Sequence, residues 1–422
     1  MSYPKCIQII PALFVIGVSL FLGACQRQSH DTANTTLRLN LGAEPSVLNP
    51  ILSTDSASSM VNGLVFNGLM KVNQALAFEV DLAESYTVSP DGKTYTFKLK
   101  RTINWHDGTP FTAQDVIFTF EKILDKSTNT VRRGNYIING KPIQIKAIDT
   151  YTVEFKLPQA FAPFISNMGM GIIPKHLYEG KDINTHPNNR NPIGTGPFIL
   201  ETWKPSQYIM LKRNPDYFTP VKLSKIHLKI IPDERTALIA LENNELDQSG
   251  IPHKDLPRFQ DHSDIRIFQY EDLLYTYLGF NLKHPFFADL RVRQAIAHAI
   301  NKQAIIDGVL KGHGKLADLP VSPLSWAYPN PNPFSGYPYD LKKSKALLTS
   351  AGFTLNESTQ ILEKDGKPFS FTLITNKGNK DREKTAQIIQ MALKQVGIDM
   401  KIQLMEWSSF IKIVNTPIDQ RN

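Results

Sequence analysis

The sequence predicts an α/β protein made of more than one domain. Along the chain, short segments in which apolar and polar residues alternate, typical of strands, take turns with segments whose apolar residues recur at helical spacing. The 422 residues exceed the usual size of one domain, so two or three domains are expected. With 41% hydrophobic and 20% charged residues, the chain has the composition of a globular protein that buries a core.

The first 24 residues are predicted to be a signal peptide and not part of the fold. Lys5 precedes an apolar run over residues 7–22, which has the length of a signal-peptide core and is short for a membrane-spanning helix. The sequence LGAC at residues 22–25 then resembles a lipobox, in which Cys25 receives a diacylglycerol and the chain is cut before it. Residues 25–35 would be a polar lipid-anchor tether, and an uncleaved anchor helix is the alternative. In both cases we expect an exported protein held at a bacterial membrane, on its periplasmic face or at the cell surface.

Cysteine usage and charge argue against several classes of function. Cys6 lies in the predicted signal peptide and Cys25 in the lipobox, so neither a disulfide nor a cysteine metal site is expected. The net charge of +8 comes from basic residues that are scattered, whereas nucleic-acid binding usually requires a basic patch. The chain has no G-x-S-x-G or H-E-x-x-H motif and its ten histidines occur singly. We therefore expect no nucleic-acid partner, no catalytic residue, no metal and no cofactor.

The first segments of the mature chain predict a strand, a loop and a helix. Residues 36–41 alternate like a strand and run into a loop over residues 42–50 that is rich in proline and small residues. Residues 58–69 then carry apolar side chains at helical spacing. Gly63 and Gly68 are expected where this helix packs closely against its neighbours.

The stretch from residue 82 to residue 124 predicts a hairpin followed by a helix. Two alternating segments flank the turn sequence SPDG at residues 89–92, which indicates a hairpin with one buried face. After a tight turn at residues 106–110, Thr112 and Asp115 have the spacing of a capping box at the start of an apolar helix. Trp105 is expected to pack in the core and Asp107 and Gly108 to form the turn, and none of these three is expected to contact ligand.

This stretch resembles the signature of the family 5 extracellular solute-binding proteins, which hand peptides to ABC importers. The family pattern W.DG.P.TA.DV..T is present here as Trp105, Asp107, Gly108, Pro110, Thr112, Ala113, Asp115, Val116 and Thr119. Two further family patterns, GTGPF…L.RNP.Y and Y.GFN…PF.D.RVR.A, match residues 194–217 and 277–295. The resemblance extends from Leu39 to Val414. It implies a periplasmic-binding-protein-like α/β fold, in which two lobes made of three subdomains surround a hinged cleft.

The resemblance also implies a division of the chain. Residues 36–56 and 185–268 would form the core of lobe I, residues 57–184 its accessory subdomain, and residues 269–422 lobe II. Family members normally continue well beyond the length of this sequence. Lobe II is therefore expected to be truncated, and to lack the acidic residue that commonly pairs with the amino group of the peptide.

Several local predictions cover the rest of the chain. Gly194 and Gly196 are expected to let two backbone segments pass closely. Residues 275–281 alternate like a strand, and residues 312–338 read as a proline-rich loop. The remaining predictions are strands at residues 222–231, 369–375 and 400–405, helices that begin after Asp233, Asp289 and Asp340, a helix over residues 382–395, a surface position for His298, and ion pairs for Arg291 and Arg293.

Candidate ligand contacts follow from the resemblance. The loop after the first strand borders the cleft in the family, so Ser46 and Asn49 are candidates, with a plain turn as the alternative. In relatives, the residues after the acidic residue that stands here as Asp247 form an extended edge beside the peptide. Ser249 and Gly250 are therefore the leading candidates, because an exposed backbone can pair with a ligand strand. Tyr275 and Trp326 are further candidates for walls of the cleft, with a position in the core as the alternative for Tyr275.

The predicted function is that of a substrate-binding lipoprotein of an ABC transporter. It would capture peptides outside the inner membrane and deliver them to the permease and ATPase subunits. One alternative is a receptor for a nickel complex, haem or glutathione, and for that function the open contacts are His106, His176, His253, His284 and His313. The other alternative is a truncated lipoprotein without transport activity.

Overall fold

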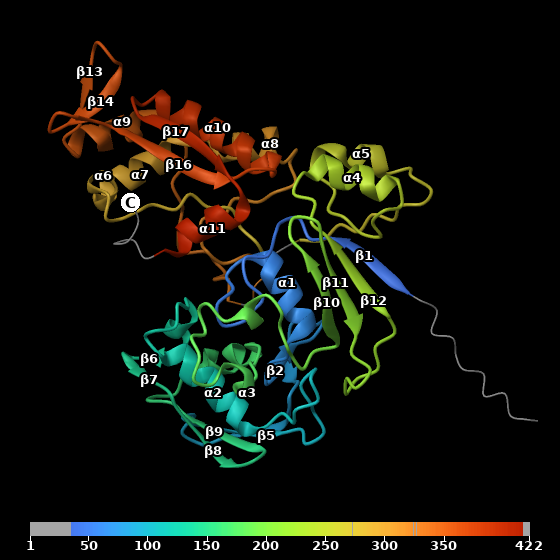
Figure 1. The fold of residues 1–422 in the computed structure, drawn as a ribbon. Helices are drawn as coiled ribbons and strands as arrows, with labels where there is room; N and C mark the ends of the chain where they lie inside the picture. The colour runs from blue at the N-terminus through green and yellow to red at the C-terminus, as the bar shows by residue number, and fades with distance from the viewer. Residues whose placement is uncertain (1–34, 272, 324, 326, 417–422) are drawn as a thin grey trace, which may run out of the picture.

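The computed structural model describes residues 35–416 with the exception of 272, 324 and 326, and these residues form two lobes (Figure 1). Each lobe has its own hydrophobic core. The core of lobe I draws on residues 39–230 and that of lobe II on residues 287–400. The predicted signal peptide, Cys25 with most of the tether, and Trp326 lie outside the described residues. No helix among the described residues is long and apolar enough to cross a membrane.

A four-stranded sheet organises lobe I. Its strand order is β1 (Thr36–Asn40), β12 (Lys225–Lys229), β11 (Tyr208–Arg213) and β10 (Phe198–Lys204). Strand β1 pairs with β12 in parallel, and the other two pairs are antiparallel, so β1, β12 and β10 all run in one direction. Helix α1 (Ser56–Val65) begins at the side chain of Asp55, which accepts a hydrogen bond from the N–H of Ser58, and packs beside β10.

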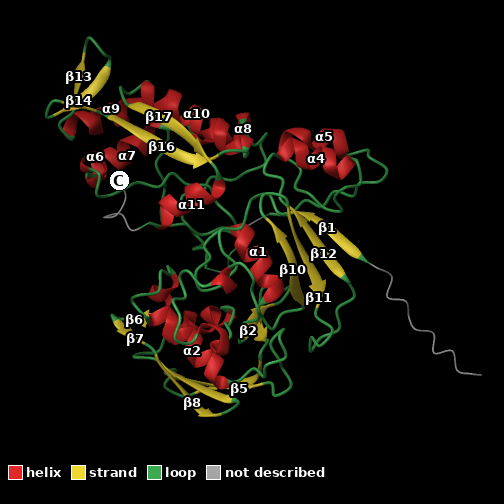
Figure 2. Ribbon diagram, in the orientation of Figure 1, coloured by secondary structure: helices red, strands yellow, loops and turns green. Residues whose placement is uncertain are grey.

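A second four-stranded sheet forms the part of lobe I farthest from lobe II (Figure 2). Its antiparallel order is β4 (Ala83–Val88), β5 (Thr94–Leu99), β9 (Thr152–Lys156) and β8 (Gln144–Asp149), and helix α2 (Ala113–Leu124) packs against it. The predicted hairpin and the capping box of Thr112 and Asp115 are confirmed. Trp105 is buried, as predicted. Strand β5 has one buried face, whereas Tyr86 and Val88 on the outer strand β4 are exposed.

Shorter elements complete lobe I. They are β2 (Met70–Val72), β3 (Phe78–Val80), η1 (Arg132–Tyr136), β6 (Ile137–Ile138), β7 (Lys141–Pro142), η2 (Ala162–Gly169), α3 (Lys175–Tyr178) and η3 (Pro187–Asn189). One hydrophobic core runs through both sheets. The division of lobe I at residues 57 and 185 therefore stays a prediction.

Glycines allow the two parts of lobe I to approach each other. A Cβ atom on Gly194 would lie 1.8 Å from the carbonyl oxygen of Val65, and one on Gly196 would lie 2.5 Å from the Val65 carbonyl carbon, so the predicted close passage is confirmed. Gly68 is also tightly packed, against the backbone of Gly169. The prediction for Gly63 is wrong, because nothing lies within 4 Å of its Cβ position. Gly63 lies on the exposed side of α1, opposite the buried Val61 and Val65.

A small helical unit follows β12. It contains α4 (Glu234–Glu242), which begins at Asp233 as predicted, together with η4 (His253–Asp255) and α5 (Leu256–Phe259). Ala237, Ala240 and Leu246 form a small core of their own. The chain then runs to lobe II through residues 265–284, of which those that the structure describes join no strand ladder.

Lobe II alternates helices and strands. Strands β16 (Ser370–Asn376) and β17 (Asp399–Met405) pair in parallel, and helix α10 (Lys380–Lys394) connects them and packs on both. The other elements are α6 (Pro285–Ala288), α7 (Leu290–Ala299), α8 (Lys302–Gly308), α9 (Leu341–Ser350), β13 (Thr354–Asn356), β14 (Ile361–Lys364), β15 (Lys367–Pro368) and α11 (Trp407–Asn415). The predicted helix starts at Asp289 and Asp340 are confirmed.

Three predictions about lobe II are wrong. Residues 275–281 form no strand, because no described segment pairs with them. His298 is only 2% exposed, since its ring packs against Tyr337 and its Nδ1 donates a 2.6 Å hydrogen bond to the carbonyl oxygen of Pro338. Arg291 does pair with Asp289, but Arg293 donates to the backbone carbonyl oxygens of residues 287 and 288 instead of forming an ion pair.

Candidate functional site

The two lobes meet at the carboxyl ends of their strands. In lobe I, β1, β12 and β10 end at the same edge of the sheet. Pro232, just beyond β12, approaches Gly378, just beyond β16, so closely that a Cβ atom on Gly378 would lie 2.9 Å from the Pro232 carbonyl oxygen. The carboxyl edges of the two sheets therefore face each other, which is where open α/β sheets bind ligands. We call this region the inter-lobe face.

Further contacts cross the inter-lobe face. The side-chain amide of Asn415, at the end of α11, donates a 2.5 Å hydrogen bond to the hydroxyl oxygen of Thr54 in lobe I. The imidazoles of His253 and His313 stack with their centroids 4.7 Å apart and their planes 6° apart. Burial lowers the pKa of His253, which keeps its ring neutral near neutral pH. Burial also raises the pKa of Glu234, and the nearby Asp381 adds to that shift.

An extended segment flanks the outer edge of the lobe I sheet. Leu39 forms a single parallel bridge with Gln248, and the Asp247 N–H donates a 2.8 Å hydrogen bond to the carbonyl oxygen of Arg38. The guanidinium of Arg38 in turn binds the Asp247 carboxylate and holds the pKa of that group below its usual value. Beyond this anchor, Ser249 is half-buried and Gly250 is exposed with open space at its Cβ position. This places the two leading candidates on an accessible backbone beside an edge strand.

The loop after β1 carries the other two candidates from lobe I. Asn49 is fully buried, and its amide donates a 2.9 Å hydrogen bond to the side-chain oxygen of Asn189. The hydroxyl of Ser46 donates to the carboxylate of Asp55, the residue that caps α1. Both side chains thus hold the loop in shape. For Asn49 the geometry favours the plain turn, and a ligand contact by Ser46 stays a prediction.

Tyr275 lies on the segment that joins the lobes. Its ring is 5.7 Å from that of Tyr277, and both side chains are exposed. Its role as a wall of the site stays a prediction. The other candidate wall, Trp326, lies outside the described residues.

Glu44, Arg190 and Trp203 form a cluster at the carboxyl edge of the lobe I sheet, and the sequence did not predict it. One Glu44 carboxylate oxygen accepts a 2.9 Å hydrogen bond from Trp203 Nε1, and the other accepts a 2.7 Å hydrogen bond from the N–H of Ser206. The guanidinium of Arg190 lies over the Trp203 ring, 3.7 Å from its centroid. These residues are far apart in sequence, and the only local signal was a glutamate in the loop after the first strand.

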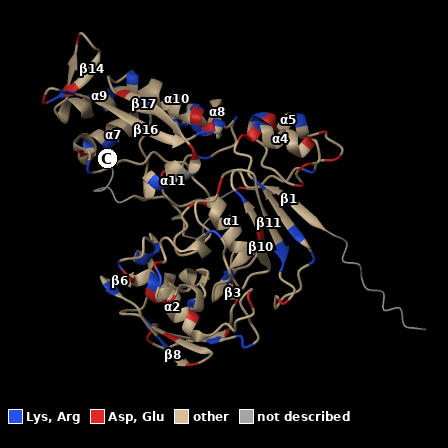
Figure 3. Cartoon of the chain, in the orientation of Figure 1, with Lys and Arg blue, Asp and Glu red and all other residues tan. Residues whose placement is uncertain are grey.

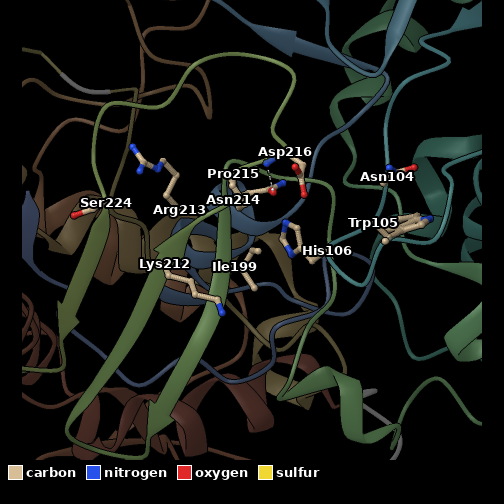
Figure 4. Close-up of a pocket in the computed structure, with 11 residues that line it drawn as sticks. Asn104, Trp105, His106, Ile199, Lys212, Arg213, Asn214, Pro215, Asp216 and Ser224 are labelled. Carbon is tan, nitrogen blue, oxygen red and sulfur yellow. Dashed lines mark hydrogen bonds between the residues drawn. The ribbon is translucent and has the colours of Figure 1, made fainter. Parts of the chain in front are cut away.

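The cavity in Figure 4 lies at the opposite end of the lobe I sheet. It has a volume of about 470 Å³ and is lined by Asn104, Trp105, His106, Gly108, Ile199, Lys212, Arg213, Asn214, Pro215, Asp216 and Ser224. His106 Nδ1 accepts a hydrogen bond from the Gly194 N–H, which places its proton on Nε2, facing the Gly196 carbonyl oxygen. Burial lowers the pKa of His106. Because Ile199 is the second residue of β10 and Arg213 ends β11, this cavity is remote from the inter-lobe face.

The other two candidate histidines, His176 and His284, each have a hydrogen-bonding partner in the chain. His176 Nε2 lies 2.8 Å from the Asp107 carboxylate, and His284 Nδ1 accepts from the N–H of Phe286. Within residues 35–416, as far as they are described, no group of three or more His, Cys, Asp or Glu side chains is arranged to hold a metal ion.

Comparison with known proteins identifies the family. The family model described as bacterial extracellular solute-binding proteins, family 5 Middle, matches residues 77–420. The chain belongs to this family. Family 5 proteins are extracytoplasmic solute-binding proteins and not enzymes.

Relatives of this family 5 chain bind peptides and other solutes. The oligopeptide-binding protein AppA of Bacillus subtilis (strain 168) is 34% identical over 420 residues, which span 95% of this chain and 76% of AppA. The structure of AppA in complex with a nonapeptide matches with a TM-score of 0.85 and 35% identity, covering 90% of this chain and 77% of AppA. NikZ from Campylobacter jejuni, in complex with Ni(L-His), matches with a TM-score of 0.77 and 30% identity over 89% of this chain and 74% of NikZ. These matches confirm the periplasmic-binding-protein-like fold.

Proposed function

We propose that this chain is the substrate-binding component of an ABC importer and captures peptides outside the inner membrane. The observation that carries this proposal is the pair of sheets whose carboxyl edges face each other, with the extended segment at Gln248–Gly250 alongside. A nonapeptide bound to AppA, which shares the fold at a TM-score of 0.85, supports the same ligand class here.

In this proposal the peptide binds as an added strand. Its backbone pairs with the chain near Ser249 and Gly250, so main-chain hydrogen bonds supply affinity that is largely independent of the peptide sequence. The described residues between 265 and 284 belong to no strand ladder, and this segment acts as the hinge. Binding favours the closed arrangement of the lobes, and the permease and ATPase subunits respond to that form.

Gly250→Val is expected to weaken peptide binding about tenfold or more, because its side chain would fill the space that the ligand strand needs. A pool of nonapeptides should raise the melting temperature of the purified mature chain, since a ligand at about 100 times its Kd adds roughly 2.7 kcal/mol to the free energy of unfolding. Isothermal titration calorimetry of a single peptide then compares the variants. Gly134→Val is the matched control, because Gly134 is also exposed with nothing within 4 Å of its Cβ position.

The same assay separates the alternatives. A melting-temperature increase with nickel–histidine, haem or glutathione but with no peptide would favour the other receptor classes, for which the NikZ complex is the supporting observation. If no ligand raises the melting temperature, the chain is a lipoprotein without transport activity and the peptide proposal is wrong.

We also propose that Cys25 anchors the protein through lipid. Replacing Cys25 by alanine removes the thiol that would be acylated, so the protein is expected to move from the membrane fraction to the soluble fraction, because each buried methylene contributes about 0.8 kcal/mol to membrane binding. Fractionation followed by immunoblotting measures this directly. Cys6→Ala is the control and should leave the distribution unchanged. Persistent membrane attachment of the Cys25→Ala protein would contradict the proposal.

A further inference from the structure

We propose that Arg190 anchors a carboxylate of the bound peptide. The inference rests on the proposed function, and it adds the chemical group that this part of the site recognises. Arg190 follows η3 and lies at the carboxyl edge of the lobe I sheet, because Trp203 is near the end of β10 and Glu44 is in the loop after β1.

The Arg190 side chain is held in place by the indole ring of Trp203. Its guanidinium carbon is 3.7 Å from the centroid of the Trp203 ring, a short distance for such a stack. The indole is fixed in turn, because its Nε1 donates to Glu44. The neighbouring backbone is also held, since the N–H of Arg190 donates to the carbonyl oxygen of Pro187, and the carbonyl oxygen of Asn189 accepts from Leu48. The guanidinium is therefore placed before any ligand arrives, which lowers the entropic cost of binding.

The hydrogen-bond donors of Arg190 remain available. Its Nη2 is 3.7 Å from the nearer Glu44 oxygen, beyond hydrogen-bonding distance, and both Glu44 oxygens already accept from Trp203 and Ser206. Within the described part of the chain, the Arg190 guanidinium donates no hydrogen bond, and its side chain is 55% exposed. One face of the guanidinium packs on the indole ring of Trp203, and its N–H groups are left for a ligand.

This geometry selects a carboxylate. A guanidinium presents parallel N–H groups that match the two oxygens of a carboxylate, and the paired hydrogen bonds are stronger than those between neutral groups. In a peptide, a carboxylate occurs at the carboxyl terminus or on an Asp or Glu side chain. Glu44 helps to hold the guanidinium without using its donors, so it leaves the N–H edge for the ligand.

The test combines one substitution with matched peptides. Affinities of the mature chain and of Arg190→Gln are measured by calorimetry for a nonapeptide without acidic side chains and for its carboxyl-amidated form. A second pair of amidated peptides differs by a single Glu or Gln. For the mature chain, we expect the affinity to fall about 10- to 100-fold in one of the two pairs, either when the carboxyl terminus is amidated or when Glu is replaced by Gln in the peptide. The pair that shows this loss identifies which carboxylate Arg190 binds. Arg190→Gln should bind both members of that pair equally.

Arg258→Gln is the matched control. Arg258 is also half-exposed, lies over the ring of Phe259 at 5.3 Å and is ion-paired with Glu242, but it is part of α5. This variant should keep the full difference between the acid and the amide. If the mature chain binds no peptide, both the proposed function and the proposed role of Arg190 are wrong. If peptides bind but Arg190→Gln retains the same acid-to-amide ratio, or the mature chain shows no ratio for either pair, only the anchor is wrong.

Discussion

Replacing Gly194 by alanine is expected to destabilise lobe I by about 3 kcal/mol or more. The added Cβ atom would lie 1.8 Å from the carbonyl oxygen of Val65, and this neighbour is backbone, which cannot rotate aside. Val65 ends helix α1 and is fully buried, so relief of the clash requires displacement of the helix from the core. Urea unfolding followed by circular dichroism gives the change in the free energy of unfolding.

Gly63→Ala provides the control within the same helix. Nothing lies within 4 Å of that Cβ position, and alanine is favoured over glycine in a helix by about 0.5–1 kcal/mol, so this variant should be slightly stabilised. The opposite signs of the two substitutions separate close packing from helix propensity. A loss below about 1 kcal/mol for Gly194→Ala would show that the contact with Val65 is not formed in solution.

Phe369→Ala is expected to destabilise lobe II alone, by about 3–5 kcal/mol. Phe369 is fully buried at the centre of an aromatic cluster, with ring centroids at 4.8 Å from Phe353 and 5.0 Å from Phe286. Its removal leaves a cavity that these rings cannot fill without losing their own contacts. Because the cores of the two lobes are separate, the thermal transition of lobe I should keep its midpoint. Differential scanning calorimetry measures both transitions.

Phe97→Ala is the reciprocal variant. Phe97 is fully buried in lobe I and packs against Phe155, so its loss should lower the transition of lobe I and spare that of lobe II. If either substitution shifts both transitions equally, the lobes unfold as one cooperative unit and the independence of their cores is refuted.

Features set by neighbouring residues could be predicted from the sequence. Thr112, Asp233, Asp289 and Asp340 begin helices as expected, because a cap needs only its own side chain and the N–H groups two or three residues later. The hairpin around residues 89–92 formed for the same reason, since its turn and its alternating pattern are local.

Features set by distant partners could not be predicted in this way. The alternation at residues 275–281 is that of a strand, but a strand also needs a neighbour for its backbone hydrogen bonds. His298 is a polar residue near the end of its helix, which favours a surface position. It is buried because the carbonyl oxygen of Pro338, in a loop 40 residues away in sequence, accepts its hydrogen bond. Tertiary contacts decided both positions.

The candidate site shows the same division. Ser249 and Gly250 are candidates because a turn motif lies next to them in the sequence, and the structure places them on an accessible backbone segment. No sequence motif links Arg190 with Trp203, because the two residues come into contact only when the loop after η3 and strand β10 lie side by side in the fold. Contacts of this kind depend on the tertiary structure and could not be predicted from local sequence patterns.

The direction of β1 has a consequence for how a lipidated protein would be oriented. The chain enters this strand at Thr36, at the edge of the sheet opposite the inter-lobe face. The ten residues between Cys25 and Thr36 can span at most about 36 Å when fully extended. If Cys25 is lipidated as proposed, the tether would attach at the end of lobe I opposite the inter-lobe face, and the inter-lobe face would be free to turn away from the membrane or toward it.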